Sequence, residues 1–378
     1  MSAADLRVGA IEYIVDRESI HAVWHDADGV SQREVIGATR RFLDLVDALR
    51  EELRSTMAVA RGRVPRLREF AAGWGRELLP VRALDADVLV VVPHAFLHDV
   101  PLHLVHVEGT ELGARVGISY ASSRSLFVRC AGRNPVRAAP ARPRRLVGGG
   151  ADVLTGDNGP FRELAGSIAD FFDPDASPQF QERWPYSRSA VKAAFRRDEV
   201  DVLCVVAHGY TDPVNHRMSG LMVELDTFGI TGRVIPLHGG RYFDFRDLPL
   251  RRFPAAVRTA SRAEILTAAE LEVDGHIDAQ LVVLLACSTG SGRVLDGDEP
   301  ASLAESFLHI GAPSVLAPMW DSDYEPTREW THRFFEAWIA DGQPKALAAR
   351  HAMRELRNGP WADRPERLGA LALRGDWL

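Results

Sequence analysis

The sequence has few cysteines and none in a paired motif. Cys130, Cys204 and Cys287 are the only ones among 378 residues, and no C-x-x-C pair occurs. This pattern argues against zinc-ribbon and thioredoxin-like proteins. Sparse, unpaired cysteines are typical of proteins in a reducing compartment. We therefore expect a cytoplasmic protein.

Long apolar runs and an excess of basic residues are also missing. No stretch of about 18 uncharged apolar residues occurs, so we expect no membrane span. The first residues, MSAADLRVGAIEYIVD, carry charges throughout and lack the apolar core of a signal peptide. The formal net charge of -7 argues against direct binding of nucleic acid, which normally requires a basic face.

Motifs for metals and cofactors are absent as well. His94 and His98 are four residues apart, but no H-E-x-x-H motif accompanies them, and prolines at 93 and 101 interrupt any helix there. The glycine run 148–150 is not followed by the Lys-Ser/Thr of a phosphate-binding loop. We expect neither a metal nor a cofactor.

Hydrophobic periodicity predicts a mixed α/β protein. Residues 7–26 alternate and predict a β-hairpin, and the apolar spacing of Val35, Phe42, Leu45, Val46 and Leu49 predicts a helix over 31–60. We predict buried strands at 87–93, 200–207, 279–286 and 314–320, and helices at 65–79, 160–172, 187–197, 300–310, 326–340 and 344–357. Apolar strands alternating with helices indicate a mostly parallel sheet covered on both faces. The long segment 209–280 is rich in Gly, Pro and charge, and we predict it to be largely irregular.

A change of composition suggests where the chain divides. Residues 133–150, RNPVRAAPARPRRLVGGG, are rich in Arg, Pro, Ala and Gly. We predict an N-terminal half at 1–135, a linker at 136–150 and a catalytic half at 151–378.

Two of the predicted buried strands end in reactive residues. The strand LCVVA is followed by His208 and Gly209, and the strand LVVLLA is followed by Cys287. Ligands bind at the carboxyl ends of parallel strands, so His208 and Cys287 converge there if the two strands are neighbours.

Such a pair would form a catalytic dyad. A free thiol is mostly protonated at neutral pH, and an adjacent imidazole can take its proton and later return it to a leaving amine. The backbone N–H groups of Gly209 and Cys287 would be candidate donors to an oxyanion.

Five short motifs carry a family resemblance: Ala207-His208-Gly209, Ala286-Cys287 through Gly290, Gly297-Asp298-Glu299, Phe307 to Val315, and Trp320 to Thr327. Together they resemble the core of CHAT domains, a branch of the caspase–separase peptidase clan. Residues 90–105 resemble that family's N-terminal half. One departure is the separation of Asp321 and Asp323 by Ser322, where the family usually has adjacent acidic residues.

The resemblance implies a caspase-like three-layer sandwich whose N-terminal half is itself pseudo-caspase-like. It implies a cysteine endopeptidase with His208 as the catalytic histidine and Cys287 as the nucleophile. The substrate would be a specific protein partner, and a separate protein would regulate the cleavage, with a role in bacterial defence. Trp320, Asp321 and Asp323 would form a wall of the substrate cleft.

Simpler interpretations remain for each of these residues. For Cys287 the alternative is a buried structural thiol, and for His208 it is a residue of a turn. For the segment from Trp320 to Asp323 it is a plain strand end. For the whole protein, the alternative is a non-hydrolytic interaction module that keeps the fold and binds a partner chain.

Overall fold

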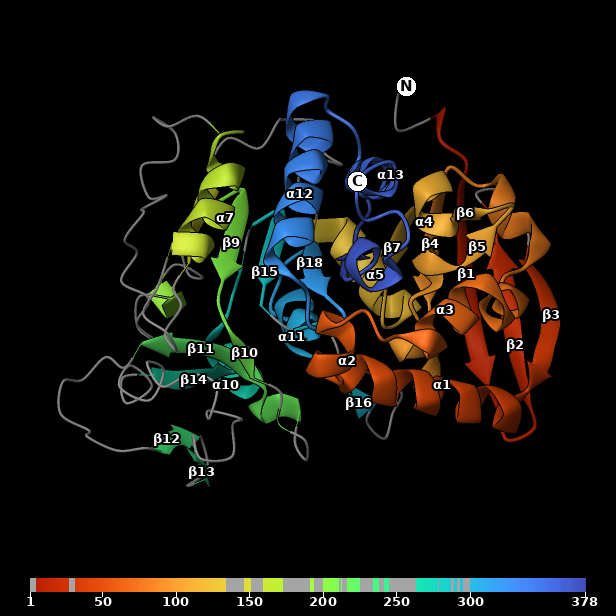
Figure 1. The fold of residues 1–378 in the computed structure, drawn as a ribbon, viewed down its shortest axis with the longest axis horizontal. Helices are drawn as coiled ribbons and strands as arrows, with labels where there is room; N and C mark the ends of the chain where they lie inside the picture. The colour runs from red at the N-terminus through yellow and green to blue at the C-terminus, as the bar shows by residue number, and fades with distance from the viewer. Residues whose placement is uncertain are drawn as a thin grey trace. The chain divides into compact units, whose positions relative to one another are not determined.

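The computed structural model describes residues 5–26, 31–133, 146–150, 159–172, 191–193, 200–210, 212, 216–224, 234–237, 241–244, 263–277, 279–286, 289–290, 293–294 and 300–378. The chain folds into two compact units, whose helices and strands are labelled in Figure 1. The first unit comprises residues 1–142, 294–300 and 319–378, and the second comprises residues 143–293 and 301–318.

In the first unit, the described strands of the large sheet run in the order β3-β2-β1-β4-β7-β19. Their bounds are β1 (Val8–Val15), β2 (Ser19–His25), β3 (Ser31–Ala38), β4 (Val88–Val92), β7 (Gly117–Tyr120) and β19 (Leu371–Gly375). The first three form an antiparallel meander, whereas β1, β4, β7 and β19 pair in parallel.

The predicted hairpin is confirmed, but the helix prediction for 31–60 is wrong at its start. Residues 31–38 form strand β3, which pairs with β2, and helix α1 (Thr39–Arg54) begins only after it. Val35 is 66% exposed, so it does not belong to the apolar stripe formed by the buried Phe42, Val46 and Leu49. Pairing with β2 supplies backbone hydrogen bonds that the local sequence pattern could not reveal.

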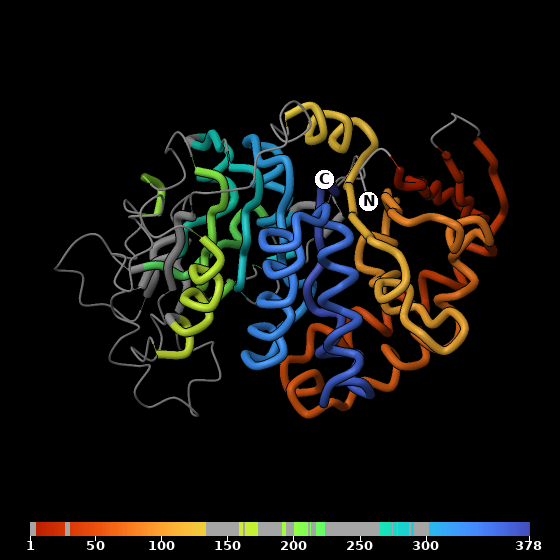
Figure 2. The backbone as a smooth tube through the Cα atoms, turned by 90° about the horizontal axis from the view of Figure 1, so that it is seen from above, coloured from red at the N-terminus to blue at the C-terminus, as the bar shows by residue number. Residues whose placement is uncertain are grey.

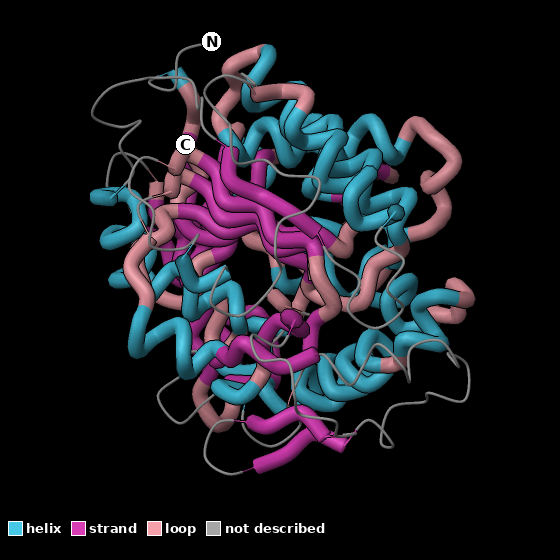
Figure 3. The backbone as a smooth tube through the Cα atoms, turned by 90° about the vertical axis from the view of Figure 1, so that its left-hand side faces the viewer, coloured by secondary structure: helices cyan, strands magenta, loops and turns pink. Residues whose placement is uncertain are grey.

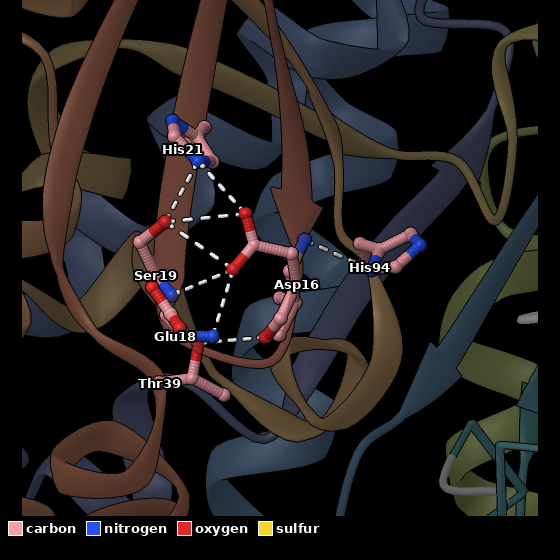
Figure 4. Close-up of polar contacts among 7 residues, drawn as sticks. Asp16, Glu18, Ser19, His21, Thr39 and His94 are labelled. Carbon is pink, nitrogen blue, oxygen red and sulfur yellow. Dashed lines mark hydrogen bonds and ion pairs between the residues drawn. The ribbon is translucent and has the colours of Figure 1, made fainter.

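The hairpin turn is held by one carboxylate (Figure 4). Asp16 accepts hydrogen bonds from the backbone N–H groups of Glu18 and Ser19, both at 2.8 Å, and from His21 Nε2 at 3.1 Å. The two backbone donors are the main reason that the pKa of Asp16 falls to about 2. Thr39 Oγ1 donates to the Asp16 carbonyl at 2.9 Å, which ties the start of α1 to the same turn.

Helices cover both faces of this sheet. Ile11, Val91 and Tyr120 share one face by register, and Tyr13 on that face donates its hydroxyl to the carbonyl of Leu78 at 2.8 Å. Gly117 lies on the opposite face, where an added Cβ would lie 2.8 Å from backbone atoms of Ala346 in α13. Helix α13 therefore packs directly on the backbone of β7.

The remaining elements of the first unit are short, apart from two long C-terminal helices that lie side by side (Figure 2). They are α2 (Thr56–Ala60), α3 (Pro65–Ala72), η2 (Trp74–Leu78), η3 (Val81–Asp85), η4 (Ala95–Asp99), η5 (Leu102–Leu104), β5 (His106–Val107), β6 (Thr110–Glu111), α4 (Leu112–Arg115), α5 (Arg124–Arg133), α12 (Tyr324–Phe335), the π-helical η10 (Glu336–Ala340), α13 (Lys345–Arg357) and α14 (Pro365–Leu368).

In the second unit, four parallel strands run in the order β18-β15-β9-β8. Their bounds are β8 (Leu146–Gly150), β9 (Val202–Val206), β15 (Leu281–Leu285) and β18 (Ser314–Pro318), with helices α7 (Gly159–Ala169), α10 (Ala268–Asp274) and α11 (Leu303–His309). Helix α7 packs on β8 and β9, and α11 packs on β18. Figure 3 shows strands running side by side with helices on either side of them.

The segment predicted to be irregular contains regular structure. Strands β10 (Gly209–Tyr210), β11 (Gly220–Glu224) and β14 (Ala263–Thr267) form a small antiparallel sheet. The segment also contains η6 (His216–Met218) and the antiparallel pair β12 (Val234–Leu237) and β13 (Arg241–Asp244). Two further short strands, β16 (Arg293–Val294) and β17 (Pro300–Ala301), lie at the sequence boundaries between the units. The pairing of β11 with β14 joins residues about forty positions apart, which no local pattern reports.

The predicted fold class, an α/β protein with a mostly parallel sheet flanked by helices, is confirmed. All predicted buried strands are present, whereas β7, β8 and β19 escaped prediction. Most of the helix predicted at 187–197 lies outside the described residues. Residues 146–150 of the predicted linker form strand β8, and the division of the chain there stays a prediction. Among the helices within the described ranges, none is long and apolar enough to cross a membrane.

A buried histidine joins distant segments of the first unit. The Nε2 atom of His103 lies 2.8 Å from the carbonyl of Gly369, which can only accept, so Nε2 carries the proton. Nδ1 then accepts from the hydroxyl of Tyr120, at 2.8 Å. Burial is the main reason that the pKa of His103 falls to about 4.

This histidine predicts a loss of stability in weak acid. The unfolded chain binds a proton at His103 near pH 6.5, whereas the folded protein does so only near pH 4, so stability falls as pH drops through that window. The contribution lost is about 3 kcal/mol, at about 1.4 kcal/mol per pH unit. We expect His103→Gln to flatten the pH dependence of the unfolding free energy between pH 4 and 6.5, measured by urea denaturation. If His103→Gln keeps the full pH dependence of the wild-type protein, the assignment is contradicted.

Candidate active site

Two fully buried parallel strands define the site. Every residue of β9 and β15 is buried, and the strands pair in register from Leu281 with Val202 to Leu285 with Val206. The backbone N–H of Ala207 extends the pairing by donating to the carbonyl of Leu285 at 3.3 Å. The two strands therefore end at the same edge of the sheet.

His208 follows the end of β9 and is half-buried. Its carbonyl accepts a hydrogen bond of 2.9 Å from the backbone N–H of Met222 in β11. Its imidazole lies against Phe161 from the first turn of α7, with ring centroids 5.1 Å apart and an interplanar angle of 52°. The small antiparallel sheet thus holds the backbone of His208, and α7 contacts its side chain.

Gly209 begins β10, the edge strand of the small sheet. It stands opposite Leu221, and the bond from Met222 N–H to the His208 carbonyl flanks that pair. In an antiparallel ladder this pattern makes Gly209 and Leu221 a non-hydrogen-bonded pair, whose N–H and C=O groups point away from each other. The N–H of Gly209 is therefore directed away from β11.

Cys287 lies outside the described residues, but the chain on both sides of it is described. Ala286 is buried at the end of β15, and its carbonyl accepts from the Thr289 hydroxyl at 2.8 Å. The next residue, Gly290, donates its N–H to the carbonyl of Pro318 at 2.8 Å. An added Cβ at Gly290 would lie 2.8 Å from that same oxygen, so the close approach requires glycine.

Helix α11, which follows this segment in the sequence, begins at a side-chain N-cap. Ser302 accepts a hydrogen bond from the backbone N–H of Glu305 at 3.2 Å, and α11 starts at Leu303. The motif Gly297-Asp298-Glu299 lies outside the described residues. The predicted helix at 300–310 is confirmed from Leu303 onward.

Trp320, Asp321 and Asp323 make their described contacts within the first unit. Trp320 is 1% exposed and donates its indole N–H to the carbonyl of Glu366 at 2.9 Å. Asp321 accepts from the hydroxyl of Thr56, and Asp323 pairs with Arg367 at 2.6 Å. These contacts anchor the segment to α2 and α14; the assignment of the three residues to substrate binding stays a prediction.

The other two cysteines belong to the core. Cys204 lies within β9 and Cys130 within α5, and both are fully buried. Burial raises the pKa of Cys204 to about 12, so its thiol stays protonated at neutral pH. A protonated thiol is a poor nucleophile, which leaves Cys287 as the cysteine to consider for chemistry.

One contact at the site escaped the sequence reading. Phe161 falls inside the helix predicted at 160–172, but an aromatic residue in an amphipathic helix carries no signal beyond core packing. Only the packing of α7 on β9 brings it to His208. Within the described ranges, no group of three or more His, Cys, Asp or Glu side chains is arranged to hold a metal ion.

A match to a protein-family model shows which family this chain belongs to. The family model described as "CHAT domain" matches residues 65–368, well over half of the chain. This protein belongs to the CHAT-domain family. The match spans both strand ends with His208 and Cys287, and also the segment from Trp320 to Asp323. The hairpin and all of α1 precede the matched residues of this CHAT protein.

Solved structures give more distant likenesses. The Arg-specific cysteine proteinase gingipain R aligns with a TM-score of 0.44 and 10% identity over 88% of this chain and 73% of its own. A complex of Porphyromonas gingivalis RgpB pro- and mature domains gives 0.42 and 11% over 89% and 76%. The Saccharomyces cerevisiae separase in its complex with securin gives 0.45 and 15%, and the CHAT protein spans 15% of that chain. No curated protein sequence matches this chain.

A glycine in β11 tests how firmly the small sheet holds His208. An added Cβ at Gly220 would lie 2.1 Å from the carbonyl oxygen of Leu266 in β14, and backbone cannot yield as a side chain can. We expect Gly220→Ala to lower stability by about 2 kcal/mol or more, and to increase amide hydrogen exchange at Met222. Gly166→Ala in α7 is the matched control, because an added Cβ there meets nothing within 4 Å. Equal exchange at Met222 in both variants would contradict this account.

Proposed function

We propose that this CHAT domain is a cysteine endopeptidase in which Cys287 is the nucleophile and His208 is the general base. The observation that carries the proposal is the register of β9 and β15. His208 lies two positions after Val206. Cys287 lies two positions after Leu285, the residue that pairs with Val206. The described register thus supports a dyad at one edge of the sheet.

In the proposed reaction, His208 takes the proton of the Cys287 thiol and the thiolate attacks the scissile carbonyl. The backbone N–H groups of Gly209 and Cys287 stabilise the oxyanion that forms. His208 then protonates the leaving amine, which leaves a thioester on Cys287. Water, deprotonated by His208, hydrolyses this thioester and releases the carboxylate product and the free thiol.

We further propose a specific protein substrate and control by a separate protein, as the family resemblance implies, in bacterial defence. Trp320, Asp321 and Asp323 would form a wall of the substrate cleft. The anchoring of Asp321 by Thr56 and of Asp323 by Arg367 supports a fixed rather than a freely moving wall. The segment 209–265 is proposed to respond to the regulator; most of it lies outside the described residues.

The dyad predicts loss of cleavage from either of two single substitutions. Cys287→Ala should remove the nucleophile and His208→Ala the base, so each should abolish substrate cleavage in a proteome-wide mapping of new N-termini. Cys204→Ala is the matched control, since that thiol lies in the core. If wild-type protein, supplied with cell extract that contains its regulator, yields the same N-termini as Cys287→Ala, the protein is the non-hydrolytic interaction module instead.

The direction of the Gly209 N–H gives a sharper test. Proline lacks an N–H and is tolerated on an edge strand where that group points off the ladder. We expect Gly209→Pro to lower kcat by about 10²–10³-fold, the usual effect of losing one oxyanion donor, with little change in thermal stability. Gly209→Ala keeps the N–H and should retain most of the activity. Equal activity of the two variants would remove Gly209 from the oxyanion site.

A further inference from the structure

The side chain of His208 has an aromatic neighbour that no motif identified. Phe161 is half-buried in the first turn of α7, directly after Pro160. Its ring centroid lies 5.1 Å from that of the His208 imidazole, and the rings are inclined by 52°. This distance is within the range of favourable aromatic pairs, which prefer inclined or offset arrangements.

The rigidity of this neighbour follows from the packing of α7. The helix packs on β8 and β9 through buried side chains that include Leu164, Ala165 and Ile168. The backbone of Phe161 is therefore held against the same strand that delivers His208. The backbone of His208 is fixed independently by the hydrogen bond from Met222.

A general base needs a fixed ring as well as a fixed backbone. The bond to Met222 holds the backbone and does not itself set the two side-chain torsions of His208, which decide where the ring nitrogens point. Catalytic efficiency depends on holding the base within hydrogen-bonding distance of the proton that it removes. A ring packed at a tilt against the imidazole restricts those torsions.

We propose that Phe161 is a positioning residue that holds the imidazole of His208 in the orientation required to deprotonate Cys287. This role rests on the proposed function. In this role Phe161 acts through His208. Its substitution should therefore reduce the rate of the chemical step while leaving substrate affinity unchanged.

The test compares three substitutions. Phe161→Leu keeps an apolar side chain but removes the ring, Phe161→Tyr keeps the ring, and Phe172→Leu makes the same change at a buried phenylalanine just beyond the other end of α7. We expect Phe161→Leu to lower kcat about tenfold at unchanged KM. This loss is a part of the rate acceleration of about 10²–10⁴-fold that general acid–base catalysis supplies. Phe161→Tyr and Phe172→Leu should stay close to wild type.

Two further measurements distinguish a displaced His208 ring from a loss of folding and from a loss of the dyad. Alkylation of Cys287 by iodoacetamide, followed by mass spectrometry, reports thiol activation without peptide recognition and should slow in Phe161→Leu. The NMR shifts of the His208 ring protons, assigned with His208→Gln, should lose the ring-current contribution of Phe161 in the Leu variant and keep it in the Tyr variant.

The outcomes are distinguishable. Wild-type kinetics in Phe161→Leu, or an equal loss in Phe172→Leu, would overturn the positioning role and leave the proposed function intact. If His208→Ala alkylates as fast as wild type, the dyad itself fails, and the catalytic role of Phe161 fails with it. Slower turnover and alkylation in Phe161→Leu alone, with recovery in Phe161→Tyr, supports the proposal.

Discussion

The common register of two buried parallel strands is the constraint on which the candidate site depends. Every side chain of β9 and β15 is removed from water, and a slip of one residue would exchange the side chains that pack on the two faces. The strands are held in place by the apolar core on both faces. Their carboxyl ends therefore coincide, and the residues that follow begin at a common edge.

The second structural requirement is the small antiparallel sheet beside this edge. It fixes the His208 carbonyl and directs the Gly209 N–H, two features that parallel strands alone do not provide. Its geometry depends on the close contact between Gly220 and the Leu266 carbonyl. The backbone N–H of Asp212 also donates to the hydroxyl of Ser219, at 2.9 Å, which links the chain after β10 to the start of β11. The site thus depends on contacts between residues distant in the sequence.

In the first unit, N-terminal and C-terminal segments form one core. His103 connects Tyr120 with Gly369, and Ser119 donates to the carbonyl of Gly375 at 2.7 Å. The segment from Trp320 to Asp323 obtains its conformation from this core, through Glu366, Thr56 and Arg367. A substitution at these partners would therefore act on the segment without touching its own residues.

The sequence by itself determined the buried strands, most of the helices and the positions of His208 and Cys287 after two of those strands. These features were readable because continuous apolar runs and helical spacing are local properties, and because the family's motifs are short and contiguous. The tertiary structure alone decided that residues 31–38 form a strand, since their pattern is polar and the hydrogen bonds come from β2. It alone decided that β11 pairs with β14, that the Gly209 N–H points off the ladder and that Phe161 lies against His208. Each of these depends on a partner far away in the sequence, and local periodicity carries no information about such a partner.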